Sequence, residues 1–378
     1  MILLSNGGTN IQRANKPSDT MAVGTVDGVA LLERTDKGWQ AVRRELAGCN
    51  VSALTALDDG TLFAATHGIG IARSTDGGNS WTWCNEGLTH IDFWAARAGK
   101  LQGREVVLAG TLPAHLFISE DRGGHWRELP ALRDVKSVSQ WCFPPAPRIG
   151  HVKEIVIDDD KIYVGIEIGA LLVSDDCGKT FRELPVDPDP RECDIHRIMV
   201  HPKRPKRIIT CNGIVGLMTS EDGGASWRKN DMPPDVNYPD PIVVHPDDPD
   251  LVFVTGASGW PPNWYKRGRA CGTIARSRDG GKTWQRLLGG LPDGQRAVFG
   301  ALTIEAWDGG YALYAADTDG QIFESRDGGE RWTIVADVPP VSKGEFYKAL
   351  VRERGRLANI DDLSFTEAAT KRVAAAQG

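Results

Sequence analysis

Three polar residues in the middle of the chain, His151, Glu167 and His196, have side chains that suit acid–base chemistry or metal binding. Imidazole changes its charge near neutral pH and binds zinc, copper, iron or nickel, and a carboxylate completes such a ligand set. We therefore expect these residues either to hold a divalent metal ion or to act as acid–base groups in catalysis. Arg197, beside His196, offers its guanidinium either to an anionic substrate or to Glu154 in a neighbouring strand.

Aromatic residues and further histidines form a second group of candidates, for ligand binding. Two irregular stretches, 137–151 and 257–271, mix aromatic residues, proline and arginine, which is typical of ligand-binding loops. Their tryptophans could stack on a sugar or an aromatic ring, and packing of the loops against the rest of the fold is an equally good interpretation. The candidates are Trp141, Trp260, Trp264, His67 and His90.

Several other chemistries lack a supporting motif. The sequence contains no HExxH or HxH pattern and no glycine-rich phosphate loop, so we expect no nucleotide cofactor. The seven cysteines are scattered and none forms a CxxC motif, which suits reduced thiols in the cytoplasm better than a disulfide framework.

Charge and hydropathy narrow the classes of partner. The formal net charge is -6, and the basic stretch 203–207 is short, which argues against nucleic-acid binding. No apolar run approaches the length of a membrane span, and residues 1–6 lack the positively charged segment of a signal peptide. We therefore expect a cytoplasmic protein that binds neither nucleic acid nor membranes.

One octapeptide recurs six times and organises the chain. Its consensus is S-x-D-x-G-x-[ST]-W, with departures at the seventh position. The copies begin 45, 55, 46, 57 and 48 residues apart, which is the period of one blade of a β-propeller. They read STDGGNSW (74–81), SEDRGGHW (119–126), SDDCGKTF (174–181), SEDGGASW (220–227), SRDGGKTW (277–284) and SRDGGERW (325–332).

The residue types of the octapeptide are those of a tight turn between two strands. Ser ends the incoming strand, Asp accepts hydrogen bonds from backbone N–H groups two and three residues on, and Gly supplies a left-handed φ. Trp starts the outgoing strand and packs back over the turn. A calcium loop is disfavoured because each copy has only one or two carboxylates. We predict a structural role for the six aspartates, Asp76, Asp121, Asp176, Asp222, Asp279 and Asp327.

Apolar strand patterns precede each octapeptide, so each repeat forms four antiparallel strands. A first repeat keeps only a remnant of the octapeptide, Thr35 to Trp39, and brings the number of repeats to seven. The sequence therefore predicts an all-β fold, a single seven-bladed β-propeller over residues 1–357. The missing strand of the first blade could come from residues 2–14 or 344–351, either of which would close the ring. Residues 358–378 look separate, and a capping box at Ser364 and Glu367 predicts a short terminal helix there.

The turns of each blade alternate between two faces, which places the candidates together. If the octapeptides join the third and fourth strands, the turns after the second strands and the connections between blades lie on the opposite face. His151 precedes the inner strand of the fourth blade, Glu167 follows its second strand, and His196 starts the inner strand of the fifth. We predict that their polar atoms converge at the mouth of the central channel, within about 8 Å. Polar residues that merely line a water-filled channel are the competing interpretation, and a one-residue register shift would turn His196 away.

The octapeptides resemble the Asp-box, or BNR, repeats of sialidases, of ten-bladed sortilin-type propellers and of photosystem II assembly-factor propellers. The resemblance covers residues 23–332 and is greatest to bacterial BNR proteins of the glycosyl hydrolase or assembly-factor type. It implies the fold but not one function, because such propellers host hydrolases, receptors and assembly factors. The Arg-Ile-Pro motif of sialidases is missing, and the nearest string, Arg148-Ile149-Gly150, sits in the wrong repeat, so sialidase activity is not expected.

Two functions remain for the sequence. The first is an enzyme, a hydrolase or lyase, that acts on a carbohydrate or another polar small molecule at the channel mouth, with or without a divalent metal. The second is a non-catalytic scaffold that binds a protein partner across its broad face.

Overall fold

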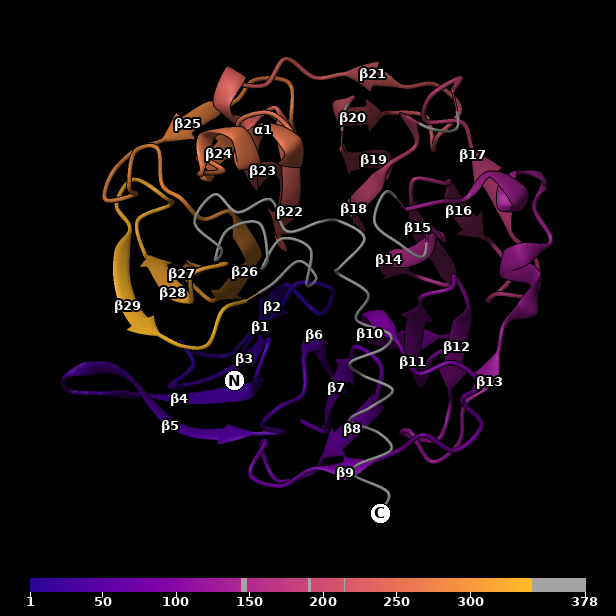
Figure 1. Cartoon of the computed structure of the whole chain (residues 1–378), viewed down its shortest axis with the longest axis horizontal. Helices are drawn as coiled ribbons and strands as arrows, with labels where there is room; N and C mark the ends of the chain where they lie inside the picture. The colour runs from indigo at the N-terminus through magenta and orange to yellow at the C-terminus, as the bar shows by residue number, and fades with distance from the viewer. Residues whose placement is uncertain (144–147, 190–191, 214, 342–378) are drawn as a thin grey trace.

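The strands form seven sheets around a central axis (Figure 1). A computed structural model of the chain describes residues 1–143, 148–189, 192–213 and 215–341. Among these residues, six sheets have four strands, and the seventh has five because an extra N-terminal strand joins it. The predicted seven-bladed β-propeller of four-stranded antiparallel blades is therefore confirmed.

The first four blades follow the chain order. Blade 1 contains β1 (Ile2–Leu4), β3 (Thr20–Thr25), β4 (Gly28–Thr35) and β5 (Gly38–Glu45). Blade 2 contains β6 (Val51–Ala56), β7 (Leu62–Thr66), β8 (Gly70–Ser74) and β9 (Thr82–Trp83). Blade 3 contains β10 (Phe93–Leu101), β11 (Arg104–Thr111), β12 (Leu116–Ser119) and β13 (Arg127–Glu128). Blade 4 contains β14 (His151–Asp158), β15 (Lys161–Glu167), β16 (Leu171–Ser174) and β17 (Arg182–Leu184).

The remaining three blades repeat this plan. Blade 5 contains β18 (Ile195–His201), β19 (Arg204–Asn212), β20 (Gly216–Ser220) and β21 (Arg228–Lys229). Blade 6 contains β22 (Tyr238–His245), β23 (Asp248–Ala257), β24 (Thr273–Ser277) and β25 (Gln285–Leu287). Blade 7 contains β26 (Phe299–Trp307), β27 (Gly310–Asp317), β28 (Gln321–Ser325) and β29 (Thr333–Asp337), together with β2 (Ile11–Arg13).

The N-terminal segment closes the ring. Strand β1 pairs in parallel with β3 and so becomes the innermost strand of blade 1, while β2 pairs in parallel with β26 of blade 7. Both strands lie close to the axis between β6 and β26 (Figure 1). Of the two segments that the sequence suggested for closing the ring, residues 2–14 therefore supply the missing strand of blade 1. Residues 344–351 lie outside the described residues.

The six octapeptides occupy the turns between the third and fourth strands, as predicted. Their hydrogen bonds follow the prediction in part: in blade 6, Asp279 Oδ1 accepts the N–H of Lys282, three residues on, at 3.0 Å. In blade 5, Ser220 Oγ accepts the N–H of Gly224 at 2.8 Å, and Asp222 Oδ1 accepts the N–H of Ser226 at 2.9 Å. The N–H at 2.9 Å from Asp222 thus comes from four residues on, one residue beyond the predicted range. The two glycines of this turn, Gly223 and Gly224, both take positive φ. Ser220 is the buried centre of the turn, whereas Asp222 is exposed.

Large apolar side chains fill the spaces between neighbouring blades. Phe63, Phe117 and Trp126 are all fully buried in the core between blades 2 and 3. The Trp126 indole N–H donates to the Cys84 carbonyl oxygen at 2.7 Å, which joins the octapeptide of blade 3 to the outer strand region of blade 2. Burial of such aromatic side chains supplies much of the driving force for stacking the blades.

Helices are short and lie in the connections. They are η1 (Pro130–Arg133), η2 (Lys136–Gln140), η4 (Pro234–Val236) and α1 (Pro261–Arg267). The stretch 257–271, expected to be irregular, contains α1. None of the helices in the described part of the chain is long and apolar enough to cross a membrane. The predicted terminal helix in 358–378 and its boundary at 357 lie outside the described residues.

Candidate active site at the inner rim of blades 4 and 5

A break in strand pairing recurs near the start of every inner strand from blade 2 to blade 7. In each case the register between the first and second strands shifts after one or two residues. Such β-bulges redirect side chains and are frequent beside functional sites. The residues left out of the pairing are Ser52, Trp94, Lys153, His196, Asp240 with Pro241, and Gly300.

His151 and Glu167 face each other across blade 4 (β14 and β15). They are paired residues of the two strands, and His151 Nε2 lies 3.2 Å from Glu167 Oε2. Their exposed fractions are 0% and 4%, so the pair is sealed from solvent. The rings of Trp94 and Phe143 pack against the imidazole, with centroid distances of 3.9 and 4.8 Å.

His196 approaches the other side of the same carboxylate from blade 5. Its Nε2 lies 3.9 Å from Glu167 Oε1 and 3.3 Å from Asp194 Oδ1. Its Nδ1 lies 3.2 Å from the Pro239 carbonyl oxygen of blade 6. The bulge at His196 in β18 thus directs the imidazole towards blade 4, and the structure brings His151, Glu167 and His196 together around one carboxylate.

Lys153 supplies a positive charge to the same cluster. Its Nζ lies 3.7 Å from Glu167 Oε2 and donates a hydrogen bond to Asn6 Oδ1 at 3.3 Å. It also sits 5.2 Å from the centroid of the Trp94 ring, a cation–π distance. Because Lys153 is only 1% exposed, its charge acts on Glu167 with little screening by water.

The protonation of the cluster follows from burial and from these neighbours. Burial lowers the pKa of His151, although Glu167 opposes the shift, so the imidazole is neutral at pH 7. Burial by itself raises the pKa of Glu167, but Lys153, His151 and His196 outweigh it and hold this pKa well below its usual range. A buried, ionised carboxylate therefore stands beside a neutral imidazole.

Arg197 is engaged in a separate ion network. Its Nη1 lies 2.9 Å from Glu154 Oε2 and its Nε lies 3.1 Å from Asp240 Oδ1. Glu154 Oε1 in turn lies 2.6 Å from Arg97 Nη2, so the network ties blades 3 to 6 together. Since Arg197 is 1% exposed, the structure favours the second of its two expected roles, pairing with Glu154, over binding of an anionic substrate.

The ligand-binding candidates lie in different surroundings. Trp264 is 3% exposed and its indole N–H donates to the Gly259 carbonyl oxygen at 2.9 Å, so its role here is loop packing. Half-buried Trp141 donates to Ser137 Oγ at 2.8 Å and packs against the core between blades 3 and 4. Trp260 is 49% exposed and remains accessible to a ligand.

The two histidine candidates are also separated. His67 Nδ1 lies 2.9 Å from Asp92 Oδ1, and its ring packs edge-on against Trp94, which also contacts His151. His67 therefore adjoins the cluster through one shared neighbour. His90 stacks on His115 at a centroid distance of 3.7 Å and belongs to a different group.

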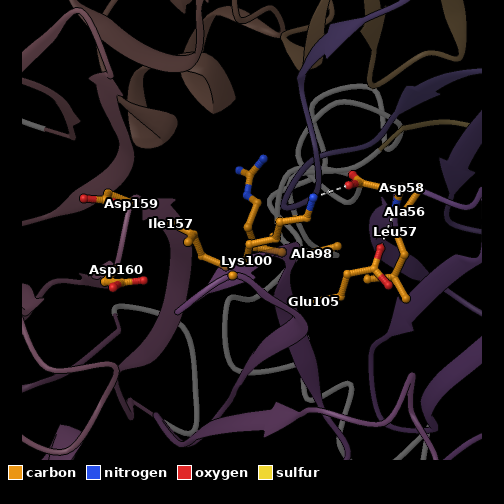
Figure 2. A pocket seen from close by; sticks show the side chains of 12 residues that line it. Ala56, Leu57, Asp58, Ala98, Lys100, Glu105, Ile157, Asp159 and Asp160 are labelled. Carbon is orange, nitrogen blue, oxygen red and sulfur yellow. Dashed lines mark hydrogen bonds and ion pairs between the residues drawn. The ribbon is translucent and has the colours of Figure 1, made fainter.

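A cavity of about 500 Å³ lies on the opposite face, the one that carries the octapeptides. Its walls come from the end of β6 and from the turns β10–β11 and β14–β15, with Lys100, Asp159 and Asp160 at its edge (Figure 2). Lys100 is already paired with Asp58 at 2.6 Å, and Asp160 accepts the backbone N–H of Gln102 at 2.5 Å. Two charged side chains of the cavity, Lys100 and Asp160, are therefore already engaged with neighbouring groups.

Two residues of the rim cluster were not among the predicted channel-mouth residues: Lys153 and Trp94. Lys153 carried one usable signal, because a lysine in the predicted inner strand of blade 4 requires a buried partner. Nothing in the strand pattern marked Trp94, since its position depends on the bulge in β10.

The fold and the six octapeptides together define an Asp-box β-propeller. The model of the sortilin family, described as sortilin, neurotensin receptor 3, matches residues 169–297. No curated protein sequence matches the chain.

Two solved structures illustrate the range of similar propellers. The chain is 19% identical to the GH74 xyloglucanase from Xanthomonas campestris, with a TM-score of 0.65 over 88% of this chain and 55% of that one. It is 15% identical to YCF48 bound to D1 peptide, with a TM-score of 0.53 over 86% of each chain. At these identities the likeness shows the fold alone, and the chain spans about half the length of the xyloglucanase.

Proposed function

We propose that the protein is a hydrolase or lyase that acts on a polar small molecule at the inner rim of blades 4 and 5, with His151 as the general base. The observation that carries the proposal is the sealed His151–Glu167 pair, with 3.2 Å between Nε2 and Oε2. Elsewhere in proteins, a carboxylate that accepts a hydrogen bond from one imidazole nitrogen fixes the tautomer and leaves the other nitrogen to take a proton.

The positions of the protons on His151 and Glu167 fit the role of His151 as a general base. The ionised Glu167 can only accept, so we place the imidazole hydrogen of His151 on Nε2, which lies 3.2 Å from Glu167 Oε2, and its lone pair on Nδ1, for which the described residues offer no hydrogen-bond partner. A neutral imidazole can take a proton from water or from a carbon acid, and Lys153 can stabilise the negative charge that then develops. Both a hydrolase and a lyase need such a proton transfer.

Carbohydrates are the first substrate class to test. Trp94 and Phe143, whose rings pack on His151, are 8% and 7% exposed, so they would offer a carbohydrate an aromatic surface only after one of them moves. A xyloglucanase is also among the similar structures. Because His151 is 0% exposed, a substrate must displace one of these rings to reach it.

The test is a screen of the purified protein against polysaccharide, glycoside, ester and lactone substrates, followed by variants. His151→Gln and Glu167→Gln should lower kcat/KM by about 10²- to 10⁴-fold, the usual contribution of a general base. His201→Gln is the matched control, because His201 is also a buried histidine (3% exposed) but bonds the Pro246 carbonyl oxygen near the strand exit. Unchanged kcat/KM in folded His151→Gln would remove His151 from the mechanism.

A second candidate, a non-catalytic scaffold that binds a protein partner, is favoured by one observation. The match to YCF48 bound to D1 peptide extends over 86% of both chains, whereas the xyloglucanase match covers only 55% of that enzyme. A scaffold would show no turnover in the screen. It would bind its partner with the same affinity in wild type, His151→Gln and Glu167→Gln. The cytoplasmic location expected from the sequence remains a prediction for either candidate.

A further inference from the structure

Asp194 and His196 form, together with Glu167, a compact group that the acid–base proposal does not explain. One ligand atom from each residue lies within 4.8 Å of the other two. The exposed fractions of Glu167, Asp194 and His196 are 4%, 8% and 0%. Glu167 ends β15 of blade 4, and the other two residues lie at the start of blade 5, so the group bridges two blades.

The hydrogen bond of His196 to blade 6 determines which nitrogen faces the carboxylates. The Pro239 carbonyl oxygen can only accept, so Nδ1, at 3.2 Å from it, carries the hydrogen. In the neutral imidazole, Nε2 then directs a lone pair at Asp194 Oδ1 and Glu167 Oε1. A lone pair that faces two carboxylates favours a positive species between them, either a proton on Nε2 or a metal ion, and the Tyr238 hydroxyl, 3.5 Å from the same Nε2, stands at the outer limit of a hydrogen bond. An Nδ1 held by a backbone carbonyl is the usual arrangement of a metal-binding histidine.

The distances favour a metal ion over a proton. A charge-assisted hydrogen bond between an imidazolium and a carboxylate spans about 2.7–2.9 Å. Two ligands that share one ion at about 2.1 Å in tetrahedral geometry stand about 3.4 Å apart. The observed separations from Nε2, 3.3 Å to Asp194 Oδ1 and 3.9 Å to Glu167 Oε1, are closer to the second arrangement.

Two further features point into this group. Asp194 Oδ1 is buried without a hydrogen-bond partner, which is costly for an ionised carboxylate oxygen unless a cation contacts it. Gly213 passes so close that a Cβ there would lie 1.9 Å from Asp194 Oδ2 and 3.4 Å from His196 Nε2. The backbone thus packs directly against the ligand atoms without adding a side chain.

We propose that Glu167, Asp194 and His196 bind one divalent cation of the first transition series, with Zn²⁺ as the best fit to one imidazole and two carboxylates. Asp194 takes the place that the sequence-based hypothesis gave to His151, which stands on the far side of Glu167. Lys153 offsets part of the negative charge of Glu167. The cation would join blades 4 and 5 whether or not the protein is an enzyme.

The experiment has two parts. The 378-residue chain is stripped of metal with a chelator and titrated with Zn²⁺ by calorimetry, and the protein as purified is submitted to elemental analysis. We expect one ion per chain. Asp194→Asn should weaken Zn²⁺ binding on the order of tenfold or more, while His151→Gln should bind as wild type does. Asp317→Asn, which changes a buried carboxylate (1% exposed) on the same face of blade 7, is the matched control and should also bind normally.

Absence of Zn²⁺ binding in the wild type, or equal binding by Asp194→Asn, would overturn the proposal. If Asp194→Asn does not fold, Co²⁺ replaces Zn²⁺ as the probe in the wild type. Visible absorption bands of bound Co²⁺ that Zn²⁺ displaces support the site, and their absence overturns it. The catalytic proposal and the metal proposal can fail separately. If His151→Gln loses turnover but still binds Zn²⁺, the two functions use different residues. If the wild type binds Zn²⁺ but shows no turnover, the metal proposal holds and the catalytic one fails.

Discussion

The octapeptide turns and the inner rim are built from the same repeat, yet they differ in how the repeat is used. Each octapeptide keeps the same Ser and Asp and makes the same short-range hydrogen bonds, as in Ser74–Asp76 and Ser220–Asp222, both at 2.8 Å. At the inner rim, where the inner strands begin, only the β-bulge is common to the blades. The residue in the bulge differs from blade to blade: it is Ser52, Trp94, Lys153 and His196 in blades 2 to 5. The side chains that recur in every octapeptide thus stabilise the individual blade. The side chains in the bulges differ between blades, so they can form a site.

The largest expected effect on stability comes from the buried ion network at the inner strands. Glu154→Ala leaves the buried Arg197 and the partly buried Arg97 without their shared carboxylate, so the free energy of unfolding should fall by about 3–5 kcal/mol. Urea unfolding followed by circular dichroism measures it. The control is Asp175→Ala, whose partners Lys161 and Arg182 are about half exposed, and which should cost about 0–1 kcal/mol. Similar losses in both variants would mean that burial does not distinguish the rim from the blade surface.

An intermediate effect is expected from the buried centre of a turn. Ser220→Ala removes the acceptor of the buried Gly224 N–H and should lower the free energy of unfolding by about 1–3 kcal/mol. The same urea experiment measures it, with Ser226→Ala, an exposed position in the same turn, as the control. A Ser226→Ala loss as large as that of Ser220→Ala would contradict the assignment of Ser220 as the centre.

The smallest effect is a dependence of stability on acid. Hydrogen bonds from the turn hydroxyls and N–H groups lower the pKa of Asp76, Asp176 and Asp222 to about 2, from 3.8 in the unfolded chain. Because these pKa values are depressed in the folded state, their contribution is fully present above pH 3.8 and is lost as the pH falls through about 2. Urea midpoints measured between pH 2 and pH 5 should therefore fall less steeply in Asp222→Asn than in wild type. Parallel curves would show that this carboxylate has no such role.

The sequence by itself determined the number of blades, the place of the octapeptides and the face on which the candidates lie. Those features follow from local rules: the two-residue period of the strands, the turn residues of the octapeptide and the period of the repeat. His151 and Glu167 could be placed together on this basis, because they are cross-strand neighbours in one hairpin of blade 4.

Only the tertiary structure decided which way the bulge residues turn and what they meet. The direction of His196 depends on a break in the pairing of β18 with β19, and Lys153 meets Asn6 from the far end of the chain because residues 2–13 close the ring. Asp194 joins Glu167 through packing between blades 4 and 5, and Arg197 is held by Glu154 and Asp240 in two different blades. These contacts join strands whose spacing along the chain carries no periodic signal, so they exist only once the seven sheets have closed around the axis.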